Sequence, residues 1–299
     1  MSNGSKLWNV LTSGTFSNIN DQFISDFRMP GSTNKFVAWD PYEKSTRYLK
    51  FLLFTMAQAQ SAMFLEKYNK ISCVDQGEPI SVKFGGCEIN SDYFAAIEEF
   101  EFLENAKPLF VSDIKHVVEI GAGFGRTCHS FLTLLPNLEK YSIIDLEPML
   151  ALSSAYLKKV APEHFDRIQF ITSDDHKQQS SLSADLAINI DSFQEMPMSV
   201  IDGYMERVIN NSDFFYSKNA VGKYLPETIG MPELSPDKLL DVFELGRCQD
   251  VIDIFDDRAL QMARNDCLKA YKPDGREWHL VNDMPMLMFP YFHHALYSC

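Results

Sequence analysis

The sequence predicts an α/β fold built on a mostly parallel sheet, and two observations support this prediction. From Ile114 onward, short apolar segments alternate with segments of helical periodicity. Parallel neighbours need a crossover connection, so this alternation is typical of a parallel sheet with helices on both faces. The chain then ends in two further extended segments, which suit an antiparallel hairpin that closes one edge and brings the sheet to seven strands.

The expected elements follow one another closely along the second part of the chain. The expected strands are His116–Ile120, Tyr141–Asp145, Arg167–Thr172, Leu186–Ile190 and Asp213–Ser217, followed by extended segments over Trp278–Met288 and Pro290–Tyr297. The expected helices are Arg126–Leu135, Pro148–Val160 and Val200–Asn210, with a helical, acidic stretch over Pro232–Lys272. Ligands of such sheets bind beyond the carboxyl ends of the strands, where we expect the functional site.

The first third of the chain has a different pattern and predicts a mainly helical region over residues 1–110, ahead of a sheet domain over 111–299. A long helix is expected over Ser45–Tyr68 and a short hairpin around Ile80–Ile89. A second helix is expected from Ser91, a residue type that suits an N-cap. We expect this region to form a lid over the pocket or a contact within a homodimer.

Composition limits the class of protein. The 299 residues are 45% hydrophobic and 23% charged, as in ordinary globular chains, and the formal net charge is −14. That charge disfavours nucleic acid and anionic membrane surfaces as partners. The six cysteines form no C-x-x-C pair, and no apolar segment is long enough to span a bilayer. We therefore expect a cytoplasmic protein without a metal site.

A glycine-rich turn follows the first expected strand. Gly121, Gly123 and Gly125 lie between that strand and the next helix, where glycine lets the backbone approach a ligand closely. The spacing is G-x-G-x-G, and Arg126 stands where a dinucleotide-binding turn has its third glycine. Glu119 lies inside the strand, where a buried carboxylate needs a hydrogen-bond partner or a cation such as a ligand amine.

Two later carboxylates suit a nucleoside ligand. Asp145 ends the second expected strand and follows Gly121 at close to the spacing of a ribose-binding acid, although it also suits a helix N-cap. A carboxylate accepts two hydrogen bonds from a ribose diol with good geometry. Asp174, after the third strand, suits an adenine amine, and a turn or cap is an equal alternative.

These residues carry a resemblance. Val117–Arg126 and Ile143–Leu150 resemble class I methyltransferases, and Asp191–Met196 is similar to a sugar O-methyltransferase family, as are Tyr271–Pro273, Trp278 and Phe289–Tyr297. The resemblance covers about residues 85–299 and implies a Rossmann-like fold. It implies S-adenosylmethionine as cofactor, S-adenosylhomocysteine as product, and a sugar or sugar-containing acceptor. The expected cofactor-binding residues are Glu119, Gly121, Ala122, Gly123, Gly125, Asp145, Leu146, Asp174 and Asn189.

Methyl transfer to a hydroxyl is assisted by a base. Asp191 and Glu195 follow the fourth strand at the carboxyl edge, and they are candidates for the base or for hydroxyl binding, with helix capping as the alternative. His293 is a third candidate because histidine titrates near neutrality, but His293 and His294 point to opposite faces of a strand. Arg126 suits the phosphate of a nucleotide sugar, and we prefer the alternative that it is an ordinary exposed cation.

Other classes of function remain open at this stage. The acceptor atom is alternatively a nitrogen, on an amino sugar or another small metabolite. An NAD-dependent oxidoreductase is a second alternative, and Arg126 at the third glycine position counts against it. A binding module that keeps the fold without catalysis is a third, and the carboxylates Asp191 and Glu195 count weakly against it.

Overall fold

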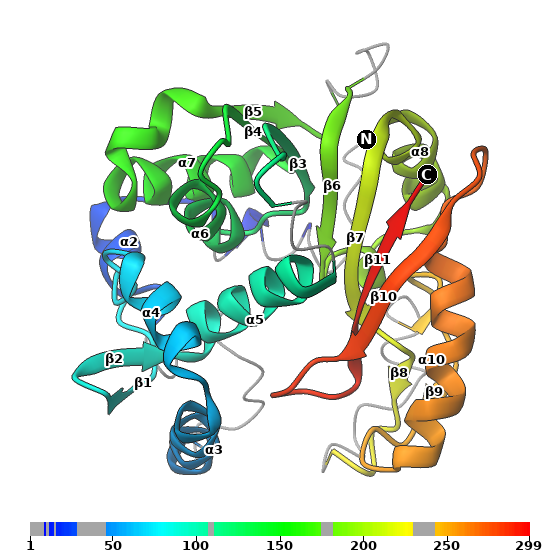
Figure 1. Ribbon diagram of the computed structural model, residues 1–299, viewed down its shortest axis with the longest axis horizontal. Helices are drawn as coiled ribbons and strands as arrows, with labels where there is room; N and C mark the ends of the chain where they lie inside the picture. The colour runs from blue at the N-terminus through cyan, green and yellow to red at the C-terminus, as the bar shows by residue number, and fades with distance from the viewer. Residues whose placement is uncertain are drawn as a thin grey trace.

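The centre of the molecule is a seven-stranded sheet. The structure, a computed structural model, describes residues 9, 12–14, 16–28, 46–106, 111–174, 182–229 and 243–299. The strand order is β10-β11-β7-β6-β3-β4-β5, and in that sheet the pairs β10–β11 and β11–β7 are antiparallel while the other four pairs are parallel. The predicted mostly parallel seven-stranded sheet, Rossmann-like with an antiparallel hairpin at one edge, is therefore confirmed (Figure 1).

Strand positions agree with the sequence pattern, with ends that differ by a few residues. The strands are β3 (His116–Ile120), β4 (Lys140–Asp145), β5 (Ile168–Thr172), β6 (Ala184–Ile190), β7 (Ser212–Ala220), β10 (His279–Pro285) and β11 (Phe292–Ser298). The agreement follows from burial, because the parallel strands are covered on both faces and each therefore contains a run of apolar residues.

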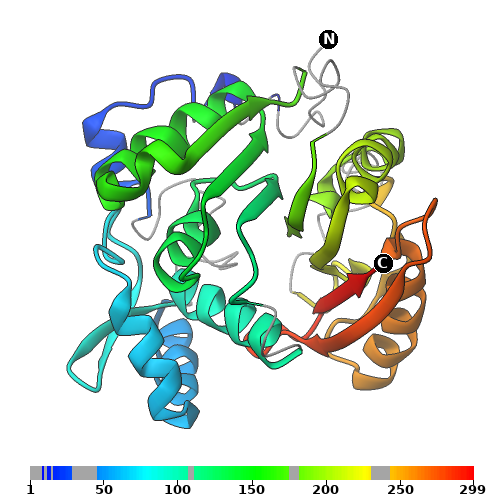
Figure 2. The ribbon, with the colours of Figure 1, turned by 45° about the horizontal axis from the view of Figure 1, so that its top comes forward.

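Helices cover both faces of the sheet. On one face pack α5 (Ser91–Ala106), α6 (Arg126–Leu134) and α7 (Glu147–Val160), and on the other pack α8 (Met198–Arg207) and α10 (Asp257–Tyr271). Successive strand residues point to opposite faces, so Tyr216 joins the core under α5 and its neighbour Phe215 joins the core under α8 and α10. Figures 1 and 2 show α5 running along the sheet from α6 toward β11, which it contacts.

The strand order places a topological switch point beside β3. This strand lies between β4 and β6, so the chain first builds outward through β4 and β5 and then returns to the other side of β3. The connections after β3 and β6 therefore leave in opposite directions at the carboxyl edge. Such a switch point is the usual binding crevice of open α/β sheets.

The N-terminal region differs from the prediction in detail. The expected long helix is two helices, α3 (Thr46–Ala59) and α4 (Ala62–Lys70), because the side chain of Ser61 accepts the Phe64 N–H and starts a new helix. The predicted hairpin is confirmed as β1 (Ser81–Phe84) and β2 (Cys87–Asn90). The N-cap expected at Ser91 is wrong by one residue, because the Oδ1 of Asn90 accepts the Tyr93 N–H at 3.0 Å.

The tail is less helical than predicted. Within Pro232–Lys272, residues 232–242 lie outside the described part, and α10 is the only long helix of the remainder. It starts where the Asp256 side chain accepts the backbone N–H groups of residues 258 and 259. A short strand β9 (Val251–Ile252) pairs in parallel with β8 (Lys223–Tyr224) ahead of it. Over the described ranges, no helix combines the length and the apolarity that a membrane crossing requires.

A buried arginine ties the chain's beginning to the sheet domain. Arg28 follows α2 (Asp21–Asp26) and is 0% exposed. Its guanidinium donates to Asp92 Oδ2 at 2.9 Å, to Asn90 Oδ1 at 3.1 Å and to the Gln76 carbonyl at 2.7 Å. Its Cζ atom also lies 5.2 Å from the ring centroid of Phe124, in the glycine-rich turn. The guanidinium N–H groups lose their contact with water on burial, and they bind protein acceptors instead, while the Phe124 ring lies beside the charge.

Replacing Arg28 by alanine tests this tie. Arg28→Ala leaves the Asp92 carboxylate without its cation, and breaking a buried pair typically costs about 3–5 kcal/mol of the free energy of unfolding. Arg258→Ala is the matched control, because Arg258 is exposed on α10 and its loss is expected to change stability by less than about 0.5 kcal/mol. Urea denaturation of both variants measures the difference. Equal effects would show that the Arg28 contacts do not stabilise the fold.

Candidate functional site

The glycine-rich turn needs its glycines for two reasons. Gly121, Gly123 and Gly125 have φ values of 78°, 59° and 94°, in the left-handed region. A Cβ atom added to Gly121 would lie 2.2 Å from Ser192 Oγ, and one added to Gly125 would lie 2.8 Å from Leu157 Cδ1. The turn therefore packs against the loop after β6 and against α7, with no room for a side chain at positions 121 and 125, while residues 121–123 stay partly exposed.

Asp145 holds the turn from the end of β4. Its Oδ2 accepts the Gly123 N–H at 3.1 Å, and its Oδ1 accepts the Leu146 N–H at 2.8 Å, just ahead of α7. Burial raises the pKa of Asp145 to about 7, against backbone N–H groups that lower it. A carboxylate has about four acceptor positions, so the carboxylate retains capacity for further hydrogen bonds at the partly exposed surface of the turn.

Glu119 lies behind the turn, inside β3. Its side chain is 2% exposed, and its Oε2 accepts the Tyr141 hydroxyl at 2.7 Å. Burial raises the pKa of Glu119 to about 7, against that hydrogen bond and the Arg126 charge. Neighbouring side chains enclose the carboxyl group, which agrees with a role in organising the turn, and contact with a ligand amine stays a prediction.

Asn189 is likewise occupied by the fold. Its amide nitrogen donates to the Ile120 carbonyl at 3.0 Å, and its Oδ1 accepts from Asn219 at 2.9 Å and from the Phe193 N–H at 3.2 Å. The side chain is 0% exposed. Asn189 therefore ties the ends of β3, β6 and β7 together, and the predicted cofactor contact stays a prediction.

The remaining predicted cofactor residues lie along the same edge. Ala122 and Leu146 are partly exposed, on the turn and just before α7, and Asp174 is exposed after β5. Burial raises the pKa of Tyr204 on α8, and the charges of Asp145 and Asp174 raise it further. These two carboxylates therefore flank one phenol, beyond the ends of neighbouring strands β4 and β5.

The two acidic candidates after β6 lie in different settings. Asp191 has φ 59°, which is uncommon for a residue other than glycine, and its Oδ2 lies 3.2 Å from Lys218 Nζ. Glu195 ends the short 3-10 helix η4 (Phe193–Glu195) and is partly exposed. Beside it, burial lowers the pKa of Lys223 to about 8, and the Glu195 charge opposes the shift. Lys223 Nζ donates to the Gln194 carbonyl at 2.9 Å.

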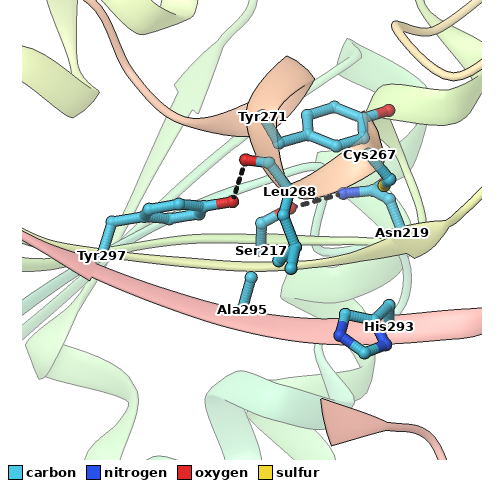
Figure 3. Close-up of a pocket in the computed structure, with 8 residues that line it drawn as sticks. All are labelled: Ser217, Asn219, Cys267, Leu268, Tyr271, His293, Ala295 and Tyr297. Carbon is cyan, nitrogen blue, oxygen red and sulfur yellow. Dashed lines mark hydrogen bonds between the residues drawn. The ribbon is translucent and has the colours of Figure 1, made fainter. Parts of the chain in front are cut away.

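His293 is not part of this arrangement, which corrects the third catalytic candidate. Its Nε2 lies 2.7 Å from Asp283 Oδ2 on β10, and burial lowers its pKa to about 4. Figure 3 shows His293 beside Asn219 at a small pocket that α10 covers, with room for about one water molecule. Asp191 pairs with Lys218 on the opposite face of the sheet, where His294 and Tyr216 also lie. The sheet thus separates His293 from Asp191.

Three charged residues in the interior were missed or misjudged from the sequence. Arg126, expected to be an exposed cation, pairs with Glu99 of α5 at 2.9 Å, and Lys218 of β7 pairs with the same Glu99 oxygen at 2.9 Å. Their signal is a charge inside an apolar run, at Glu98-Glu99 within Tyr93–Leu103 and at Lys218 after Phe214–Ser217. Among the described residues, no three His, Cys, Asp or Glu side chains are placed to hold a metal ion.

Comparison with known proteins gives distant structural likeness. No protein-family model matches the sequence, and no curated protein matches it. The methyltransferase domain of bacterial CtHen1-C is 11% identical over 67% of this chain and 97% of that chain, with a TM-score of 0.44. The mitomycin 7-O-methyltransferase MmcR is 11% identical, covering 87% and 68%, with a TM-score of 0.43. The glycopeptide N-methyltransferase MtfA is 14% identical, covering 68% and 86%, with a TM-score of 0.42. Likeness at this level carries no argument about activity.

The buried Glu119 carboxyl predicts a pH dependence of stability. Its pKa is raised in the folded state from 4.5 to about 7, so its stabilising contribution is present below the lower value and is lost as the pH rises through the upper one. We expect the free energy of unfolding of the wild type to fall, relative to Glu119→Gln, between about pH 5 and about pH 8. Glutamine retains an acceptor for the Tyr141 hydroxyl and does not titrate. Parallel pH profiles from denaturant titrations would contradict this.

Proposed function

We propose that this chain is an S-adenosylmethionine-dependent methyltransferase whose acceptor is a hydroxyl group of a sugar or of a glycosylated small molecule. The observation that carries the proposal is the Asp145 carboxylate at the switch point. It accepts backbone N–H groups from the glycine-rich turn and from the start of α7, and it retains acceptor capacity beside both. A nucleoside diol needs that combination of a fixed acceptor and a closely approachable backbone.

The residues present fit this cofactor. Gly121, Ala122 and Gly123 offer partly exposed backbone without Cβ interference at the glycines, which suits the amino-acid end of the cofactor. Asp145 would hold the ribose hydroxyls, and the partly exposed Leu146 would cover one side of the adenine ring. Asp174, exposed beyond β5, is the candidate for the adenine amine. Glu119 and Asn189 support the turn from behind.

Methyl transfer requires that the acceptor hydroxyl is oriented toward the methyl group and that a nearby group accepts the hydroxyl proton. The bound cofactor supplies an electrophilic methyl group, so an oxygen–carbon bond forms as the sulfur–carbon bond breaks and the hydroxyl proton leaves. Asp191 is the candidate proton acceptor because it lies at the end of β6, in a strained backbone conformation that the surrounding fold maintains. Glu195, four residues on and partly exposed, is a candidate for binding a second hydroxyl.

The proposed acceptor class rests on the resemblance of residues 191–196 and of the aromatic tail to a sugar O-methyltransferase family. Tyr291 and Phe292 are 7% and 4% exposed and contact each other with ring centroids 4.4 Å apart, so they support the site from the core. The acidic pair Asp191 and Glu195 also suits a cationic amine, which keeps an amino sugar as the second candidate acceptor. The net charge of −14 favours a small molecule over a nucleic acid.

Calorimetry with two aspartate variants tests the cofactor. Asp145→Ala is expected to abolish S-adenosylmethionine binding, which we expect in the micromolar range for the wild type. Asp185→Ala is the matched control. Asp185 Oδ2 accepts the backbone N–H groups of Lys115 and His116, each at 2.7 Å, at the amino ends of β6 and β3 and away from the proposed cofactor site. This control is expected to lose stability and to keep binding. If both variants bind as the wild type does, Asp145 does not hold the cofactor.

A panel of acceptors tests the reaction. Free monosaccharides, nucleotide sugars and amino sugars are incubated with the cofactor, and S-adenosylhomocysteine is measured. We expect turnover with a hydroxyl acceptor, and we expect Asp191→Asn to lower kcat by about 10²–10⁴-fold, the usual contribution of a base. Turnover that requires the amino group would move the assignment to N-methylation. Absence of turnover with every sugar would reject the proposed acceptor class.

A further inference from the structure

A charge cluster lies beside the proposed acceptor site, and it consists of Glu99, Arg126, Lys218 and Asp191. It reaches the surface at Asp191, whose side chain is 40% exposed. Glu99 Oε1 accepts from Arg126 Nη2 and from Lys218 Nζ, each at 2.9 Å. The same ammonium group of Lys218 lies 3.2 Å from Asp191 Oδ2. The side chains of Glu99 and Lys218 are 0% and 1% exposed. Four separate elements, α5, α6, β7 and the end of β6, therefore meet in one balanced set of two acids and two bases.

Stability alone is a poor reason for this cluster. Desolvation of buried ions is costly, and replacement of a buried ion pair by apolar residues of similar volume is often neutral or stabilising. The surroundings would accept such residues, because Lys218 contacts the Met286 sulfur at 3.9 Å and the Phe292 ring at 5.7 Å. The cluster also ends at a residue held at φ 59°. A costly desolvation and a strained backbone conformation at the same place are typical of functional positions.

We propose that Lys218 is a positioning residue of the acceptor site, which holds the Asp191 carboxylate ionised and in one orientation while Glu99 fixes the ammonium group from the opposite side. This inference rests on the proposed function, because it assigns a task to the base of that reaction. Lys218 reaches Asp191 in two ways: its side chain contacts Oδ2, and its carbonyl accepts the Asp191 N–H at 2.7 Å. The strained residue is thus fixed at backbone and side chain by one partner.

Neighbouring charges shift the Asp191 pKa in opposite directions, so removing different neighbours should move it up or down. Burial raises the pKa of Asp191, Lys218 and Arg126 lower it, and Glu99 raises it. Burial raises the pKa values of Tyr216 in β7 and of Tyr291 before β11, and the Asp191 charge raises both further. Without Lys218, desolvation is no longer opposed by an adjacent cation, and Asp191 is expected to bind its proton at higher pH.

The test follows the Asp191 carboxyl signal by NMR in protein labelled with ¹³C-aspartate, and Asp191→Asn identifies the signal. Lys218→Met is expected to raise the Asp191 pKa by about 1–3 units, the usual effect of one adjacent charge. Lys218→Arg keeps the charge and is expected to titrate close to the wild type. Glu99→Gln is expected to lower the pKa. Lys115→Met is the control: Lys115 is exposed, just before the amino end of β3, and its replacement is expected to leave the Asp191 pKa unchanged.

Kinetics with the best acceptor of the panel completes the test. The acidic limb of the kcat/KM profile is expected to move upward in Lys218→Met by the same number of units as the NMR titration, and to return in Lys218→Arg. A folded Lys218→Met protein with an unchanged Asp191 titration overturns the inference. If that variant does not fold, an unchanged titration in Glu99→Gln overturns it. Failure of every acceptor rejects the proposed function separately, because the titrations need no acceptor.

Discussion

The geometry of the candidate site depends on one carboxylate that two loops share. Asp145 binds the backbone of the glycine-rich turn and the first residue before α7, so the connections that leave β3 and β4 cannot move independently. The Asn189 amide does the same for the ends of β3, β6 and β7. Side chains that bind backbone groups are rigid supports, and a site held in this way needs little rearrangement on binding.

The sheet could be predicted because strands that are buried on both faces have a simple sequence pattern, a short apolar run between helical segments. The turn residues were visible for a similar reason, since positive φ values restrict the choice to glycine. The break between α3 and α4 was missed because alanine and glutamine, which both favour helices, fill residues 57–60, and the cap at Ser61 is a single serine in an otherwise helical pattern. For the tail, leucine and acidic content suggested a helix longer than α10.

The roles of individual side chains at the edge were harder to predict. Position in a strand shows that His293 and His294 face opposite sides, but which side meets Asp191 depends on how β11 pairs with β7. Glu99 and Lys218 are 119 residues apart, and no local pattern indicates that they meet. Asn189 was placed correctly at the edge, but its amide is used by the neighbouring strands.

The contact between Arg28 and the glycine-rich turn has a consequence for how the molecule is assembled. Arg28 is separated from Asp92 by 64 residues, and its Phe124 partner comes later still. A ribosome therefore releases the arginine long before the groups that surround it exist, and the charged side chain stays in water until α5 and the turn are made. Closing this contact carries a large cost in loop entropy, since the paired residues lie far apart in the sequence. The packing of the bend after β3 thus depends on Arg28, a residue from a much earlier segment of the chain.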